Sequence, residues 1–357
     1  MKNTFLRIPV IRTGALALFL LTGCATHKKA PKNYTFFPAP PDEPRIQYLT
    51  GFSSEQELGG SSWFQDFVLG SDQSAQPISK PYGITAEKDH LYICDTGPSV
   101  LAIVNLSKLK LDRFGSGGEG RMRMPINTAV DDAGTRYVTD TVRGQILIYA
   151  ADDTYLGAIG KKDEMKPVGI VIATNRLYVS DLKNHTVRVY DPSTRELLFT
   201  IPRDGADEKS RLFSPTNLAV DQQGRIYVSD TGGFFVKVFD ADGHFVRQIG
   251  EAGLGVGHFA LPKGIAVDRE TRLYVVDAAT QVVQLFDADG RLLMFFGDTS
   301  QGGEGASYLP AGIAVDYNNV RQFQKFAAPG FKIEYLIFVT NQYGKHKVNV
   351  YGFGRRH

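Results

Sequence analysis

The chain repeats one pattern six times after residue 80, and this repetition is the strongest constraint on its fold. A proline opens a short apolar segment in each copy. Consecutive prolines are 44, 42, 48, 47 and 48 residues apart, and they are Pro81, Pro125, Pro167, Pro215, Pro262 and Pro310. A fixed period in the forties is typical of β-propellers and solenoids. No window keeps apolar residues at helical spacing through the repeats, so the pattern favours strands over helices.

Each copy also carries the signatures of further strands. A segment such as LYICD or LYVVD ends in an acidic or amide residue. An alternating segment such as VVQLFD follows it, with the period of two that is typical of a half-exposed strand. A fourth strand follows in the first five copies, but the sixth copy stops without one. An unpaired sheet edge would remain there.

Residues 45–52, RIQYLTGF, resemble the missing fourth strand. We therefore predict an all-β fold, a six-bladed β-propeller over residues 45–357 whose last blade is closed by this N-terminal strand. The tetrapeptide Asp-Ala-Asp-Gly occurs at 240–243 and at 287–290, after two third strands. Its Asp-Gly chemistry predicts tight hairpin turns, and neither loop has the ligand spacing of an EF-hand calcium site.

The repeats resemble the NHL family of six-bladed β-propellers. The motifs that carry the resemblance are Pro-x-Gly-Ile-Ala-Val-Asp at 262–268, Leu-Tyr-Val-x-Asp at 273–277 and Val-x-Val-Phe-Asp at 236–240, and the resemblance extends over about residues 45 to 353. It implies the fold and leaves the activity open, because propellers host many functions. NHL lipoproteins of this kind are suspected neighbours of multihaem c-type cytochromes, so the resemblance also points to an extracytoplasmic electron-transfer complex.

Residues 1–23 have the layout of an export signal. Lys2, Arg7 and Arg12 precede an apolar run over residues 15–21 that is too short to span a bilayer. The run ends in Leu-Thr-Gly-Cys, which resembles the lipobox of bacterial lipoproteins. The resemblance implies cleavage before Cys24 and lipidation of that cysteine. The absence of an aspartate directly after Cys24 implies sorting to the outer membrane, with the periplasmic or surface-exposed side left open.

Residues 24–44 are the predicted tether between the lipid and the propeller. Five prolines lie between residues 27 and 44, and such a composition favours extended polyproline II. If Cys24 carries lipid, the only other cysteine is Cys94, so no internal disulfide can form. Cys94 lies in a predicted buried strand, which is typical of an inert core thiol.

Acidic residues end the second strand in each of the first five blades. One interpretation is a metal-binding ring of carboxylates, and the other is that each side chain caps its own turn, a role that every blade needs equally. We predict turn caps and no metal site at Asp95, Asp140, Asp181, Asp230 and Asp277. The histidines fall at different points of their repeats, so we expect no zinc site at the axis and no cofactor.

Basic residues flank the prolines on the same predicted face. Together they would form a cationic collar for an anionic ligand or an acidic partner: Lys80, Arg123, Lys166, Arg211 and Lys263. The same loops also contain Glu119, Glu164, Glu208 and Glu251, so ordinary solvated loops are the competing interpretation. The net charge of +2 gives no reason to expect nucleic acid as a partner.

Two segments interrupt the repeat and are candidates for partner contacts. Residues 61–70 contain Trp63, the only tryptophan, in a segment that could either pack on the propeller or anchor a partner. Residues 317–335 form an insertion in the sixth blade, where aromatic and cationic residues alternate: Arg321, Phe323, Lys325 and Phe326. Such a mixture suits a protein contact or a loop that covers the blade edge.

The sequence contains no nucleophile elbow, no P-loop and no haem-attachment motif. We therefore expect a lipid-anchored scaffold that binds another protein at the outer membrane or in the periplasm. The alternative from another class is a metal-dependent lyase or lactonase with its site in the central channel. Propeller enzymes of similar shape include the zinc-dependent peptidylglycine amidating lyase and calcium-dependent gluconolactonase-like lactonases.

Overall fold

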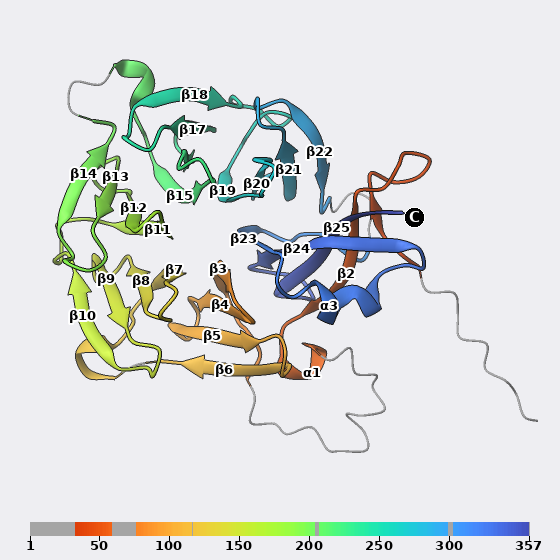
Figure 1. Ribbon diagram of the computed structural model, residues 1–357, viewed down its shortest axis with the longest axis horizontal. Helices are drawn as coiled ribbons and strands as arrows, with labels where there is room; N and C mark the ends of the chain where they lie inside the picture. The colour runs from red at the N-terminus through yellow and green to blue at the C-terminus, as the bar shows by residue number, and fades with distance from the viewer. Residues whose placement is uncertain (1–32, 59–75, 116, 204–206, 299–302, 357) are drawn as a thin grey trace, which may run out of the picture. The chain divides into compact units, whose positions relative to one another are not determined.

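Six antiparallel sheets surround a central axis in the computed structural model of this protein, and the first strand of each sheet is innermost (Figure 1). The structure describes residues 33–58, 76–115, 117–203, 207–298 and 303–356. The sheets belong to the unit that extends from Tyr34 to His357. The predicted six-bladed β-propeller is therefore confirmed.

The first five blades have four strands each. Blade one comprises β3 (Pro81–Glu87), β4 (His90–Asp95), β5 (Val100–Asn105) and β6 (Lys110–Phe114). Blade two comprises β7 (Pro125–Val130), β8 (Arg136–Asp140), β9 (Gln145–Tyr149) and β10 (Tyr155–Ile159). Blade three comprises β11 (Pro167–Ala173), β12 (Arg176–Asp181), β13 (Thr186–Tyr190) and β14 (Leu197–Ile201). Blade four comprises β15 (Pro215–Val220), β16 (Ile226–Asp230), β17 (Phe235–Phe239) and β18 (Phe245–Ile249). Blade five comprises β19 (Pro262–Val267), β20 (Leu273–Asp277), β21 (Val282–Phe286) and β22 (Leu292–Phe296).

Blade six draws its strands from both ends of the chain. Its order from the axis outward is β23 (Pro310–Asp316), β24 (Phe331–Asn341), β25 (Val348–Arg356), β2 (Ile46–Phe52) and β1 (Phe36–Phe37). The helical segments are short: α1 (Glu55–Leu58), α3 (Val320–Phe323), η1 (Gly118–Gly120), η2 (Glu208–Ser210) and η3 (Gln324–Phe326). None of the helices in the described ranges is long and apolar enough to cross a membrane.

The repeated prolines begin the first strands, as the spacing predicts. Each one lies opposite the polar residue that ends the second strand, for example Pro262 opposite Asp277, and the register shifts directly after the pair. The first position of a strand tolerates proline, because the missing N–H leaves no gap in the ladder. The two Asp-Ala-Asp-Gly segments form the predicted hairpin turns, with Gly243 and Gly290 at φ of 87° and 84°.

The N-terminal strand closes the ring, as predicted. β2 pairs with β25 from Ile46 opposite Phe353 to Phe52 opposite Val348. The structure differs from the sequence-based expectation just before this strand, where part of the predicted tether joins the sheet. Phe36 and Phe37 form β1 on the outer edge of β2. Their aromatic rings explain this, because Phe36 packs against Phe331 at 5.5 Å and Phe37 against Phe296 at 6.0 Å.

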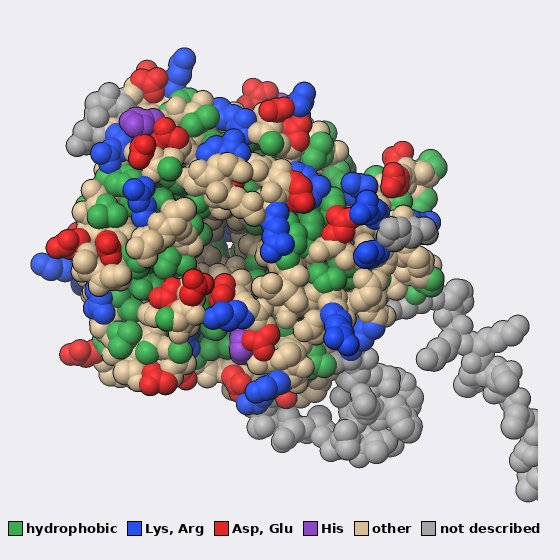
Figure 2. All heavy atoms as spheres, in the orientation of Figure 1, with side chains coloured by type: hydrophobic (Ala, Val, Ile, Leu, Met, Phe, Trp, Pro, Cys, Tyr) green, Lys and Arg blue, Asp and Glu red, His purple; other side chains and the backbone are tan. Residues whose placement is uncertain are grey.

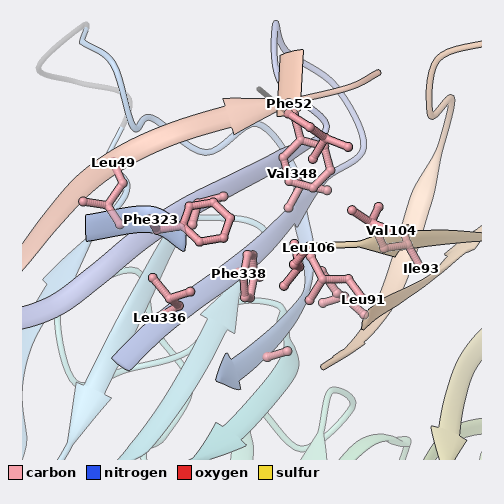
Figure 3. Close-up of a cluster of buried hydrophobic side chains, with 14 of the residues drawn as sticks. Leu49, Phe52, Leu91, Ile93, Val104, Leu106, Phe323, Leu336, Phe338 and Val348 are labelled. Atoms are coloured by element: carbon pink, nitrogen blue, oxygen red, sulfur yellow. The ribbon is translucent and has the colours of Figure 1, made fainter. Parts of the chain in front are cut away.

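The hydrophobic core is divided among the six seams between neighbouring blades. The cluster between blades six and one includes Leu91, Ile93, Phe338 and Val348, and Figure 3 shows these side chains converging from separate sheets. Burial of apolar area at every seam stabilises the ring by about 25 cal/mol per Å². Cys94 is fully buried in the cluster between blades one and two, where burial raises the pKa of its thiol, and it forms no disulfide.

Candidate functional site

The loops before the first strands and the turns after the second strands lie at one end of the blades, which we call the mouth face. Antiparallel order places them there, because consecutive strands run in opposite directions. The face comprises the described parts of residues 76–80, 115–124, 160–166, 202–214, 250–261 and 297–309, and the turns 96–99, 141–144, 182–185, 231–234, 278–281 and 342–347. The remaining loops form the opposite face.

Buried aspartates join the loops and turns of the mouth face. Asp140 accepts hydrogen bonds from the backbone N–H groups of Arg123 at 2.6 Å and Met124 at 3.1 Å in the loop. It also accepts from Val142 at 3.2 Å and Arg143 at 2.9 Å in the turn. Backbone N–H groups of the preceding loop also bond to the four equivalent aspartates, Asp95, Asp181, Asp230 and Asp277. All five side chains are fully buried, and these contacts are those of turn caps.

Four of the five collar residues lie in these loops, and Lys263 follows as the second residue of β19. None of the five forms an ion pair with a described carboxylate. Lys80, Arg123, Lys166 and Arg211 are exposed, whereas Lys263 is partly buried. Two of the nearby acids have other partners, since Glu164 pairs with Arg188 at 3.2 Å and Glu251 pairs with His258 at 2.9 Å. The charge of the collar is therefore available to a ligand or partner.

Lys263 and Tyr82 meet across the mouth of the channel. Lys263 Nζ lies 5.2 Å from the centre of the Tyr82 ring, although blade six separates their blades. Both side chains must therefore point toward the axis. Burial lowers the pKa of Lys263, and the positive charge of Lys80 lowers it further. Burial also raises the pKa of Tyr82 to about 12.

Two asparagines narrow the channel one residue deeper than Tyr82 and Lys263. Asn127 Nδ2 donates to Asn217 Oδ1 at 3.2 Å and to the Val168 carbonyl at 3.3 Å, which links blades two and four past blade three. The other blades have glycine at this level, and the reason is close approach. A Cβ added at Gly83 would lie 1.9 Å from Asn127 Oδ1, and one at Gly312 would lie 2.4 Å from the Tyr82 carbonyl oxygen.

The inner channel has a volume of about 220 Å³ and is lined by first-strand residues of all six blades. Figure 2 shows a narrow opening at the centre of the blades. The lining offers the amides of Asn127 and Asn217 but no histidine, cysteine or carboxylate. Zinc needs three or more such ligands, and protein calcium sites draw on carboxylates, so this lining fits neither ion. No group of three His, Cys, Asp or Glu side chains that could hold a metal occurs in the part of the chain that the structure describes.

Exposed large hydrophobic side chains are distributed unevenly over the propeller. Eight of those in the described residues lie in mouth-face loops and turns: Met124, Val142, Phe213, Phe234, Leu254, Val256, Tyr308 and Tyr343. The others lie on outer strands: Leu156, Leu197, Leu198, Val246, Leu293 and Phe295. The described loops of the opposite face contribute none. The mouth face thus combines exposed aromatic and aliphatic groups with unpaired cations.

The blade-six insertion lies on the opposite face, and its four candidate residues have different environments. Phe323 is only 3% exposed and packs against Phe338 at 5.8 Å, as Figure 3 shows. Its burial favours the interpretation of a segment that covers the blade. Arg321 and Lys325 are exposed, and Lys325 lies 4.9 Å from the ring of the partly buried Phe326.

Sequence reasoning missed a set of side chains that tie the mouth-face loops to the third strands. Lys237 Nζ donates to the carbonyl of Lys209 at 2.5 Å. Gln284 Nε2 donates to His258 O at 2.7 Å, and Asn349 Nδ2 donates to Ala306 O at 2.9 Å. All three occupy the same position of the third-strand repeat, the polar residue between two apolar ones in Val-Lys-Val, Val-Gln-Leu and Val-Asn-Val. The alternation predicts an exposed side chain at this position, whereas the structure buries all three.

Two sequence-based expectations concern residues outside the described ranges. These are lipidation at Cys24 and a partner contact or packing role for Trp63.

Comparisons with known proteins agree with the fold. A sequence family described as a 6-bladed beta-propeller, DUF5128, matches residues 208–294. A stretch of 81 residues is 27% identical to Protein SUPPRESSOR OF QUENCHING 1, chloroplastic, from Arabidopsis thaliana. That match covers 21% of this chain and only 8% of the plant protein.

Solved structures similar to this one include proteins of different activities. A protein of unknown function from Bacteroides thetaiotaomicron has a TM-score of 0.58 at 17% identity, covering 86% of this chain and 75% of that one. A gluconolactonase from Xanthomonas campestris has a TM-score of 0.54 at 16% identity, covering 91% and 99%. A streptogramin B lyase has a TM-score of 0.52 at 12% identity, covering 78% and 84%. At these identities the similarity shows the six-bladed propeller fold alone.

Proposed function

We propose that this protein is a protein-binding propeller that docks a partner on its mouth face, and that lipid on Cys24 anchors it at the outer membrane. The observation that carries the proposal is the concentration of exposed apolar side chains in the loops and turns of that face. Aromatic residues and arginine are enriched at protein interfaces, and they supply most of the binding energy. Phe213 with Arg211 at 5.5 Å is a pair of this kind.

The cations of the mouth face indicate which charge the partner should carry. The collar side chains have no described carboxylate partner, so a docking protein with acidic groups would gain charge complementarity. Such complementarity raises the rate of association and excludes partners of the wrong charge. The partner class follows the expectation for an exported lipoprotein, namely a protein of the periplasm or outer membrane, including the components of an electron-transfer complex.

The competing proposal is a lyase or lactonase with a metal in the channel. The solved lyase and gluconolactonase propellers share the fold with this chain, but the lining of the inner channel has neither histidine nor carboxylate. The donor set therefore supports the binding role better than the enzymatic one.

Affinity purification of the tagged, detergent-solubilised full-length protein tests the proposal. The first variant replaces Lys80, Arg123 and Lys166 by glutamate on the mouth face. The matched variant carries Arg321→Glu and Lys325→Glu on the opposite face, where both side chains are also exposed. Mass spectrometry and metal analysis are applied to each eluate.

We expect a stoichiometric partner with the wild type and with the opposite-face variant, and loss of that partner with the mouth-face variant. A partner lost only from the opposite-face variant would place the interface on the blade-six insertion instead. One bound metal per chain without any partner would replace this proposal by the enzymatic one.

A further inference from the structure

The mouth of the channel contains a converging set of hydrogen-bond donors that has no acceptor among the described residues. Lys263 reaches toward the axis over Tyr82 at 5.2 Å, and the exposed Lys80 lies two residues before Tyr82 in the chain. Neither ammonium group has a described carboxylate or carbonyl within bonding distance. From this arrangement we infer that the channel mouth is a binding site for a carboxylate group, held by Lys263 and Lys80 beside Tyr82.

Charge and partial burial together favour an external anion at this position. A partly buried ammonium group normally has a counter-ion or accepting oxygens, because removing it from water is costly. Lys237 shows the usual solution in this same chain, since its Nζ donates to backbone carbonyls of Lys209 and Arg211. Lys263 has instead a second cation and the face of an aromatic ring. An approaching anion would remove this imbalance.

A second observation points to an acceptor on the axis. Asn217 is 6% exposed, and its Nδ2 has no hydrogen-bond partner, while its Oδ1 accepts from Asn127. The first strand enters the channel from the mouth, so Asn217 lies about one residue deeper than Lys263. Asn217 is one of the residues that line the inner channel, and its unpartnered Nδ2 is itself enclosed. The accessible donors are therefore the ammonium groups of Lys263 and Lys80 at the mouth, and the channel lining adds no acidic side chain that would repel an anion.

The narrow channel limits the size of the group that enters. The channel volume of about 220 Å³, which the asparagine pair helps to line, is otherwise lined mainly by Ile, Val, Leu, Ala and Gly residues. A single carboxylate on a slender stem fits this geometry, as found in an Asp or Glu side chain or in a small organic acid. The acidic side chain would come from the docked protein, and in that respect the inference deepens the proposed function and rests on it.

Thermal unfolding with sodium acetate as the probe tests the site. The melting temperature is measured in acetate and in chloride at equal ionic strength, so that general screening cancels. At about ten times its dissociation constant, acetate should raise the wild-type melting temperature by roughly 2 to 4 °C. Lys263→Met and Lys80→Met should each lose most of this increment, and Lys161→Met, an exposed mouth-face control, should keep it.

The same variants distinguish a folding defect from a binding defect. In chloride, Lys263→Met should melt no lower than the wild type, because it removes one of two like charges. Equal acetate increments in Lys263→Met and Lys161→Met would overturn the inference, as would the absence of any increment in the wild type. If Lys263→Met does not fold, Lys80→Met alone decides by the same comparison.

A parallel titration with polyglutamate separates the two sources of the carboxylate. If both acetate and polyglutamate raise the melting temperature in a way that depends on Lys263, the acidic side chain of a polypeptide reaches the site. If only acetate raises the melting temperature, the ligand is a free organic acid. The proposed function is tested independently. If the partner is captured and then lost on mutation of the mouth face while acetate has no effect, the carboxylate site fails and the docking face stands.

Discussion

Removal of a single buried turn cap should lower the free energy of unfolding substantially, and Asp277→Ala is the variant that tests this most directly. The carboxylate is fully buried and accepts from the N–H groups of Ala260 at 2.7 Å and Leu261 at 3.1 Å. It also accepts from Ala279 and Thr280 in the turn, but Ala279 is exposed and water can replace that bond. Ala260 and Leu261 are partly buried, and each N–H shielded from water and left without an acceptor costs about 1 to 3 kcal/mol. Two such groups give a loss of about 4 kcal/mol in the free energy of unfolding.

Asp277→Asn should lose only about half as much free energy of unfolding as Asp277→Ala. The amide keeps one accepting oxygen but turns its NH2 group toward the second N–H donor, which leaves one donor unsatisfied at a cost of about 2 kcal/mol. Blade six uses asparagine at the same position without such a conflict. Asn341 Oδ1 accepts from Tyr308 N at 3.0 Å, and its Nδ2 donates to His346 O at 3.2 Å in a longer turn.

Equilibrium urea unfolding followed by circular dichroism measures these differences, with Asp287→Ala as the control. Asp287 caps a hairpin of the opposite face through Asp289 N and Arg291 N, which are solvated, so its loss should cost about 1 kcal/mol or less. The reasoning is refuted if Asp277→Ala loses less than about 1 kcal/mol. It is also refuted if Asp277→Asn and Asp277→Ala unfold at the same urea concentration.

Three further predictions follow from the ring closure and the blade-six insertion. Deletion of residues 45–52 removes β2 and exposes the edge of β25, so a single cooperative melting transition should give way to broad unfolding, and an unchanged melting curve would contradict the closure. Glu57→Gln should lower stability by about 0.5 kcal/mol at about pH 5.5, where an ordinary imidazole is protonated and the Glu57 carboxylate lies 3.8 Å from His346 Nδ1 in a partly exposed ion pair. That pairing lowers the pKa of Glu57, so the contribution disappears as the pH falls through the lowered value; a difference that persisted in acid would exclude it. Phe323→Ala should cost about 3 kcal/mol in urea unfolding, whereas Arg321→Ala should stay within about 0.5 kcal/mol, and equal effects would contradict the burial of Phe323.

The fold was accessible from the sequence because each blade repeats the same local requirements. A proline opens the first strand, a polar residue ends the second, and the third alternates, so the number of copies predicts the number of sheets. The closing strand was accessible for a different reason. The sixth copy lacks a fourth strand, and an open edge in a ring requires a partner from elsewhere in the chain. Residues 45–52 offered a matching pattern.

Contacts that form only in the assembled ring were not accessible in this way. Phe36 and Phe37 lie in a proline-rich segment of the sequence. They nevertheless join blade six, because their rings pack against Phe331 and Phe296. The Asn127–Asn217 hydrogen bond and the approach of Lys263 to Tyr82 depend on the diameter of the ring. No local pattern specifies that distance, so pairs across the axis emerge only with the assembled propeller.

The residue after each repeated proline shows where the repeat leaves the side chain unconstrained. The six residues at this position are Tyr82, Ile126, Val168, Thr216, Lys263 and Ala311. Their variety in size and polarity shows that blade architecture does not dictate the side chain there, in contrast to the glycine or asparagine one position later, where close approach does. A lysine at an unconstrained and partly buried position is destabilising unless its charge is matched. Folding supplies Lys263 with the face of the Tyr82 ring but with no described carboxylate, and the proposed carboxylate ligand would provide the missing counter-charge.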